Sequence, residues 1–110
     1  MKAARFGIAV AVAFLFGAHL ALAQSGDAAA GKAVYDRTCA TCHGPDGTPK
    51  DAVAKMLKVE MRHLGSKEVQ ARSDADIQKI ILEGFQKMKA QRVAEKDVAN
   101  VIAHLRTLKQ

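Results

Sequence analysis

Hydrophobic residues in the second half of the chain recur at the spacing of an α-helix rather than a strand. One series starts after the capping-box-like sequence Ser73-Asp74-Ala75-Asp76 and ends at Gly84. Its hydrophobic members are Ile77, Ile80 and Ile81. A second series has the i, i+3, i+4, i+7, i+10 spacing of one helical face and consists of Val98, Val101, Ile102, Leu105 and Leu108. The pattern predicts two amphipathic helices whose apolar faces form a core.

A further helix is predicted at the start of the same domain. Asp27 is an acceptable N-cap, and the helix runs through Val34 toward Cys39. Residues 44–49 contain two glycines and two prolines, which cannot continue a helix. We therefore expect a loop after residue 43.

Two shorter segments complete the predicted elements. A short helix is expected from about residue 51 to 57, with Val53, Met56 and Leu57 facing inward, and another turn begins near Ser66. Residues 85–93, which include Met88, read as irregular structure. The chain shows no alternating strand pattern and no internal repeat. The predicted fold class is all-α, with three to five short helices.

The amino terminus has the features of a secretory signal peptide. Lys2 and Arg5 precede an uncharged apolar run at residues 8–16, and Ala21-Leu22-Ala23 provides a small-x-small cleavage site. These features predict a signal peptide at residues 1–23 and one domain at residues 24–110. An uncleaved anchor is the alternative, although the apolar run is short for a membrane span. We expect no stable membrane insertion after cleavage.

The size and charge of the predicted mature chain narrow the function further. Its 87 residues suffice for one small domain. Without Lys2 and Arg5, fifteen basic residues remain against eleven acidic residues, a net charge of about +4. This excess is small, and the chain has no nucleic-acid-binding motif. We therefore expect no nucleic-acid partner.

The sequence Cys39-Ala40-Thr41-Cys42-His43 carries the most specific chemistry of the chain. Two thiols three positions apart, followed at once by an imidazole, form the attachment site of a c-type haem. Each thiol adds across one vinyl group of the porphyrin, and the histidine becomes the proximal iron ligand. The motif predicts one covalent haem c bound through Cys39 and Cys42, with His43 on the iron.

Three other readings of the cysteine pair remain open. A thioredoxin-like dithiol belongs in a βαβ context, and no strand-like run precedes Cys39. A disulfide is common in exported proteins. A structural zinc site needs a second ligand pair, and His63 and His104 lack paired spacing.

A six-coordinate electron carrier needs a second axial ligand, and a methionine sulfur favours ferrous iron and raises the reduction potential. Met56 lies on the apolar face of a predicted helix, where a core role is the ordinary explanation. Met61 and Met88 both lie in irregular stretches and remain candidates. His63 would give a bis-histidine site of lower potential, but its neighbours look solvated.

At these residues the chain resembles a small class I c-type cytochrome, from about residue 27 to 108. The resemblance rests on the haem motif with the preceding Ala29-Ala30-Gly31-Lys32-Ala33-Val34-Tyr35, on the helix that starts at Ser73, and on Lys87-Met88-Lys89 before the last helix. It implies that Met88 is the distal ligand, with Met61 as the alternative. It also gives a proline near the motif, here Pro45 or Pro49, the role of accepting a hydrogen bond from His43.

The resemblance further implies that the first and last helices cross closely. Gly31 would permit the approach beneath the ring of Tyr35, facing Ala103, His104 and Leu105. The chain departs from the family at three positions: Lys89 replaces a common proline, Ala94 replaces a hydroxyl cap, and His104 replaces an aromatic residue. We interpret His104 as a packed histidine rather than a ligand.

The resulting hypothesis is a monomeric, periplasmic monohaem cytochrome that carries one electron between redox proteins and is not an enzyme. Lysines near Met88 and in the preceding region could steer acidic partners: Lys50, Lys55, Lys58, Lys87 and Lys89. Two alternatives are a gas-binding or peroxidase-like haem protein with an open sixth position, and a thiol redox protein using Cys39 and Cys42. The sequence names neither the electron donor nor the acceptor.

Overall fold

The computed structural model describes residues 26–110, so the predicted signal peptide at residues 1–23 lies outside the described residues. The described part is helical, and its only strand-like feature is an isolated bridge between Phe85 and Met88. The predicted all-α fold is confirmed. The six helices of residues 26–110 are α1 (Ala28–Thr38), α2 (Ala40–His43), α3 (Asp51–Leu57), α4 (Lys67–Gln70), α5 (Asp74–Glu83) and α6 (Glu95–Thr107).

The described part of the chain has six helices, one more than the predicted maximum of five, because the first predicted helix is divided at Cys39. The backbone N–H of Cys39 still donates to the Tyr35 carbonyl over 2.8 Å and closes α1. A separate turn, α2, then begins at Ala40 and ends at Gly44, whose φ is +68°. Cys42 and His43 therefore lie on this short turn and Cys39 lies at its junction with α1, so the motif is not part of one continuous long helix.

Side-chain capping explains where three of the six helices of residues 26–110 begin. The Asp27 carboxylate accepts from the backbone N–H groups of Ala29 and Ala30, as predicted for an N-cap. Ser66 and Ser73 cap α4 and α5 in the same way. At the start of α6, Ala94 makes no side-chain capping hydrogen bond, because a methyl group cannot accept one.

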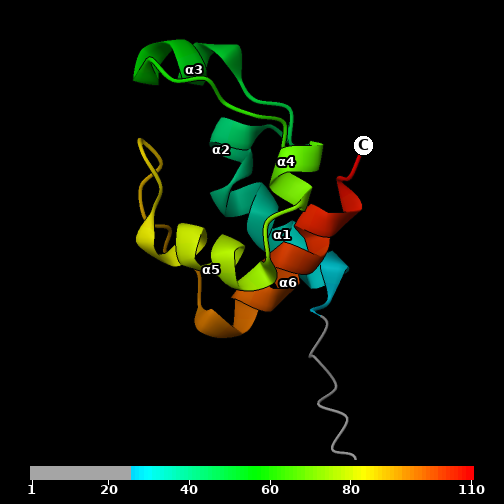
Figure 1. The fold of residues 1–110 in the computed structure, drawn as a ribbon. Helices are drawn as coiled ribbons and strands as arrows, with labels where there is room; N and C mark the ends of the chain where they lie inside the picture. Colours follow the sequence, from blue (N-terminus) through cyan, green and yellow to red (C-terminus); the bar gives the residue numbers. More distant parts are fainter. Residues whose placement is uncertain (1–25) are drawn as a thin grey trace, which may run out of the picture.

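The core forms where α1 crosses α6 and where α5 packs beside α6 (Figure 1). Gly31 allows the crossing, because a Cβ at this position would lie 1.8 Å from the Asn100 carbonyl oxygen. Tyr35 is fully buried and packs against the His104 ring at a centroid distance of 4.9 Å. The predicted crossing is present, but Gly31 faces Asn100 rather than Ala103. The buried hydrophobic residues are Val34, Tyr35, Ile77, Ile81, Val93, Val98, Val101, Ile102 and Leu105.

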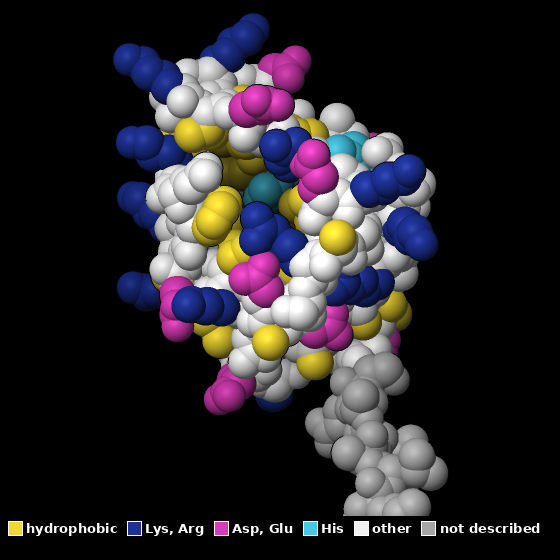
Figure 2. Space-filling view, in the orientation of Figure 1, with side chains coloured by type: hydrophobic (Ala, Val, Ile, Leu, Met, Phe, Trp, Pro, Cys, Tyr) yellow, Lys and Arg dark blue, Asp and Glu magenta, His cyan; other side chains and the backbone are white. Residues whose placement is uncertain are grey.

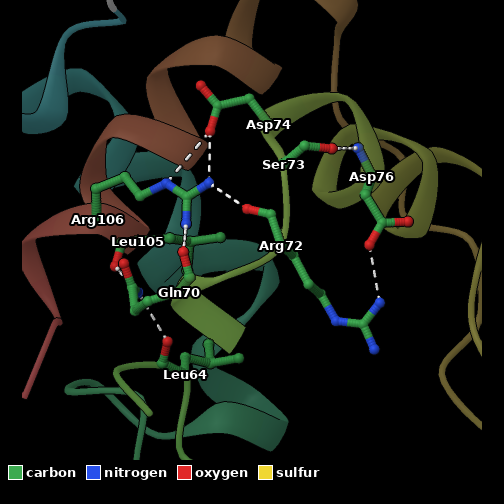
Figure 3. A network of polar contacts seen from close by, with 8 residues as sticks. All are labelled: Leu64, Gln70, Arg72, Ser73, Asp74, Asp76, Leu105 and Arg106. Atoms are coloured by element: carbon green, nitrogen blue, oxygen red, sulfur yellow. Dashed lines mark hydrogen bonds and ion pairs between the residues drawn. The ribbon is translucent and has the colours of Figure 1, made fainter. Parts of the chain in front are cut away.

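A polar network ties the short α4 region to α6 (Figure 3). The Gln70 amide donates to the carbonyls of Leu64 and Leu105, both over 2.9 Å. The Arg106 guanidinium donates to the Gln70 carbonyl over 2.9 Å and to the Asp74 carboxylate over 2.6 Å. Side-chain donors thereby bond part-buried backbone carbonyls and join the α4 region to α6.

Helix α3 stands apart from this core (Figure 1). It contains no buried residue, and Met56 is 71% exposed. The expectation that Met56 faces inward is therefore wrong: helical periodicity shows which residues share a face, not whether protein covers it. Within residues 26–110, no helix combines the length and hydrophobicity needed to cross a bilayer.

Candidate functional site

The Cys39, Cys42 and His43 side chains are brought together by one tight turn at the end of α1. The N–H groups of Cys42 and His43 both donate to the Cys39 carbonyl, over 3.2 and 2.9 Å. Both cysteines are half-buried free thiols. The structure therefore has no disulfide between Cys39 and Cys42. Burial, followed by the nearby Cys42, raises the pKa of the Cys39 thiol to about 11. A reactive dithiol needs a lowered pKa, so the thiol redox reading is not supported.

The His43 imidazole is half-buried, and this burial lowers its pKa. The ring is therefore neutral near pH 7, the form in which imidazole binds a metal. Its Nδ1 is buried and has no hydrogen-bond partner. The expected hydrogen bond to a proline carbonyl is thus absent from this structure. An unpaired buried nitrogen is costly, and Nδ1 is the nitrogen expected to donate to the proline carbonyl, so the other ring nitrogen is the one that would bind a metal.

Tyr35 has a role at the site that the sequence reasoning missed. Its hydroxyl donates to the Gly44 carbonyl over 2.6 Å, directly after the motif. Burial is the main cause that raises the Tyr35 pKa to about 12, so the hydroxyl stays a donor. The available signal was the position of this residue: it is the only tyrosine of the chain and lies one helical turn before Cys39. This hydrogen bond ties Gly44, the residue after the motif, to the buried Tyr35 of the core.

The loop after the motif folds back on it. The Lys50 N–H donates to the Cys42 carbonyl over 3.1 Å, and the Asp46 carboxylate accepts from the Thr48 N–H over 3.0 Å. That hydrogen bond is the main cause that lowers the pKa of Asp46. Gly44 and Gly47 both have positive φ, which a glycine adopts without strain. These contacts hold α2 in place between α1 and α3.

The face that carries α2 is hollowed (Figure 2). Hydrophobic side chains line the hollow, and a histidine side chain lies at its floor (Figure 2). Comparison with the ribbon in the same orientation places the hollow over α2, below α3 and beside the turn at residues 85–88 (Figure 1). An apolar hollow beside two free thiols and a neutral imidazole fits a flat hydrophobic cofactor attached through sulfur.

The candidate axial methionines come from different segments. Met88 is half-buried in the turn between α5 and α6, and Met61 is half-buried in the extended stretch between α3 and α4. Met56, with most of its side chain exposed on α3, lies outside the core. The structure therefore keeps Met61 and Met88 as candidates.

The two other histidines of the described residues, His63 and His104, make structural contacts. His104 is buried against Tyr35, in agreement with the prediction of a packed histidine. The His63 Nδ1 accepts a hydrogen bond from the Gly65 N–H over 2.8 Å. In residues 26–110, no group of three Cys, His, Asp or Glu side chains is arranged to hold a metal ion, so the zinc reading lacks a ligand set there.

Comparisons with known proteins agree with this arrangement. Residues 26–105 match the family model described as "Cytochrome C oxidase, cbb3-type, subunit III". Cytochrome c-554(547) of Halothiobacillus neapolitanus is 32% identical over 91 residues, which cover 77% of this chain and all of that protein. The solved structure of the KustC0563 c-type cytochrome is 31% identical, with a TM-score of 0.62 over 73% of this chain and 98% of that chain.

The family match spans nearly all of the described residues. Both relatives are cytochromes, and the similarity covers almost the full length of each. The Cys39/Cys42 pair fits the attachment motif of covalent haem. Members of this family typically carry electrons. The chain belongs to the small monohaem c-type cytochromes, with covalently attached haem c as its cofactor.

Proposed function

We propose that this cytochrome is a periplasmic one-electron carrier with histidine and methionine as axial ligands. Cys39 and Cys42 form the two thioether bonds, His43 is the proximal ligand and Met88 is the distal ligand. The observation that carries the proposal is the turn from Cys39 to His43, where two free thiols and a neutral, half-buried imidazole occupy one short segment.

The chain's own residues give the site its properties. The His43 imidazole is already neutral and needs no deprotonation before it binds iron. The Tyr35 hydroxyl holds the Gly44 carbonyl, which limits movement of the attachment turn. When bound, haem supplies a metal that changes its oxidation state by one electron. The protein contributes ligands, an apolar surrounding and a docking face.

Met88 is preferred over Met61 because its segment is fixed on both sides. The Phe85 and Met88 backbones pair through two hydrogen bonds of 2.9 Å, and the Gln91 N–H donates to the Ile81 carbonyl over 2.8 Å. The family resemblance also assigns the distal ligand to this position. The Met61 segment is held by hydrogen bonds from Val59 to Ala54 and from Leu64 to Gly47, each 3.1 Å long, which flank the methionine instead of closing a turn at it.

The periplasmic location is part of the proposal. It rests on the charged, apolar and small-residue regions of residues 1–23, which precede a domain with a haem attachment motif. A periplasmic product is expected to have the mass of residues 24–110 plus one haem and no free thiol. A colourless product with two titratable thiols would contradict the attachment, and a polypeptide mass that still includes residues 1–23 would contradict the cleavage.

The docking face is proposed to lie around Met88 and α3. Lys87 and Lys89 flank Met88, and Lys55 lies on α3. Basic side chains line one edge of the face that holds the hollow (Figure 2). Met56 and Phe85, the two exposed large hydrophobic residues of the described chain, lie in the same segments. Exposed apolar groups within a basic rim suit an acidic redox protein that docks transiently.

Replacement of the two methionines tests the ligand assignment. Met88→Ala is expected to abolish the sulfur-to-iron charge-transfer band of the ferric protein and to lower the reduction potential, because a soft ligand that favours ferrous iron is lost. Haem stays attached through the cysteines. Met61→Ala is the control and is expected to leave band and potential nearly unchanged. The reverse result would assign the ligand to Met61, and ready binding of carbon monoxide by the parent protein would favour an open sixth position.

A further inference from the structure

The segment that carries Met88 is a closed, four-residue turn. Phe85 and Met88 exchange two backbone hydrogen bonds, each 2.9 Å long. Gln86 within the turn has a φ of +51°, in the left-handed region. A Cβ at Gly84 would lie 2.8 Å from the Met88 carbonyl oxygen, so the turn sits close against the end of α5. Because the two backbones are paired, a shift of Phe85 moves Met88 as well.

Phe85 is 45% exposed, and its ring contacts Arg72 from the connection between α4 and α5. The Arg72 guanidinium lies over its ring, 5.2 Å from the centroid. A guanidinium within about 6 Å of a ring face attracts it through the negative potential of the π-system. This contact attaches the turn after α5 to Arg72, which lies in the connection before α5.

Arg72 itself is held at both its side chain and its backbone. Its guanidinium pairs with the Asp76 carboxylate over 2.8 Å, and its carbonyl accepts from Arg106 over 2.7 Å. Arg106 also pairs with Asp74, so the anchor extends to α6 (Figure 3). A side chain fixed in this way loses less conformational freedom when it covers a ring than a free surface arginine does.

We propose that Arg72 is a positioning residue for Met88 and acts through the Phe85 ring. This inference rests on the proposed role of Met88 as distal ligand. The contact keeps the turn against the body of the protein, so that the methionine sulfur remains at the iron. Without it, the turn moves away more readily and the sulfur is more easily displaced by another ligand.

Imidazole displacement of the sulfur from the ferric, haem-loaded protein measures this effect. The exchange replaces an iron–sulfur bond by an iron–nitrogen bond without a change in oxidation state. Arg72→Gln is expected to lower the imidazole dissociation constant about two- to fivefold, the range of an exposed cation–π contact. Arg72→Lys, which keeps the charge, is expected to restore part of the parent value. Arg92→Gln is the matched control, since it removes the same charge from the Met88-containing connection.

A double-mutant cycle with Phe85→Leu separates positioning from a general loss of stability. In the Phe85→Leu background, Arg72→Gln is expected to have no further effect on imidazole affinity. An equal effect in both backgrounds, or an effect no larger than that of Arg92→Gln, would overturn the inference. The spectra of Met88→Ala and Met61→Ala identify the bound methionine independently. If Met88 is that ligand and Arg72→Gln changes nothing, the inference fails while the proposed function stands; if Met61 is, both fail.

Discussion

The α1–α6 crossing and the surroundings of the hollow are held together by different means. Every buried hydrophobic residue of the described chain lies on α1, α5 or α6, except Val93, which lies just before Ala94, the N-cap of α6. By contrast, α3 buries no residue, and Met56 and Phe85 are exposed. The crossing is stabilised by contacts between protein side chains. The surroundings of the hollow depend on the cofactor to cover their apolar side chains, so one small domain contains a region that folds by packing and a region that haem completes.

Removal of haem is the most severe test of this difference. A Cys39→Ser/Cys42→Ser double variant without haem is expected to lose amide-exchange protection throughout α3, because this helix contains no buried residue. Residual protection is expected in α1 and α6. Far-UV circular dichroism and hydrogen exchange measure both effects. Equal protection of α3 and α6 in the haem-free protein would contradict the comparison.

Gly31→Ala tests the packed region. The added Cβ would lie 1.8 Å from the Asn100 carbonyl oxygen, so α1 and α6 must separate. We expect a loss of about 1–3 kcal/mol in the free energy of unfolding of the haem-loaded protein, measured with denaturant. Ala33→Ser, on the exposed side of α1, is the control, with an expected change within about 0.5 kcal/mol. A Gly31→Ala protein as stable as the parent would show that the crossing is loosely packed.

His104→Phe tests the polar group buried in the crossing. Burial lowers the His104 pKa below its usual 6.5, with Lys32 acting in the same direction and Asp36 opposing it, and Nε2 has no hydrogen-bond partner. The native state therefore resists protonation, and stability present above pH 6.5 is lost as the pH falls toward the lowered pKa.

Phenylalanine cannot take up a proton and leaves no unpaired nitrogen. We expect the variant to be more stable by about 1 kcal/mol at neutral pH, with a difference that grows between pH 6.5 and the lowered pKa. Denaturant midpoints of both haem-loaded proteins across this range measure the effect. A constant or shrinking difference on acidification would show that His104 is protonated as easily in the folded protein as in the unfolded chain.

Charge reversal at Lys87 and Lys89 tests the hollowed face without affecting the core. The double change to glutamate is expected to slow reduction by an acidic redox protein about tenfold at low ionic strength and to flatten the salt dependence. Stability should change little. Lys96→Glu/Lys109→Glu gives the same change in net charge on and after α6 and serves as control. Equal slowing by both pairs would indicate that net charge, rather than this face, controls the rate.

Local sequence signals determined much of this protein. Asp27, Ser66 and Ser73 are N-caps because a short polar side chain can bond the free N–H groups of the next turn wherever the helix lies. The end of α5 at Gly84 and the attachment motif at Cys39 to His43 were likewise predictable, since their chemistry depends on residues a few positions apart.

Only the tertiary structure decided what covers each face. Met56 lies on an apolar helical face and is nevertheless exposed, because α3 does not pack against the core. The approach of Gly31 to Asn100 and the position of Arg72 over Phe85 join segments far apart in the chain. Helical periodicity and capping act within a few residues, whereas these contacts depend on how distant helices cross. The sequence therefore determined the helices and the haem chemistry. The packing of distant segments decided which side chains are buried and which contact one another.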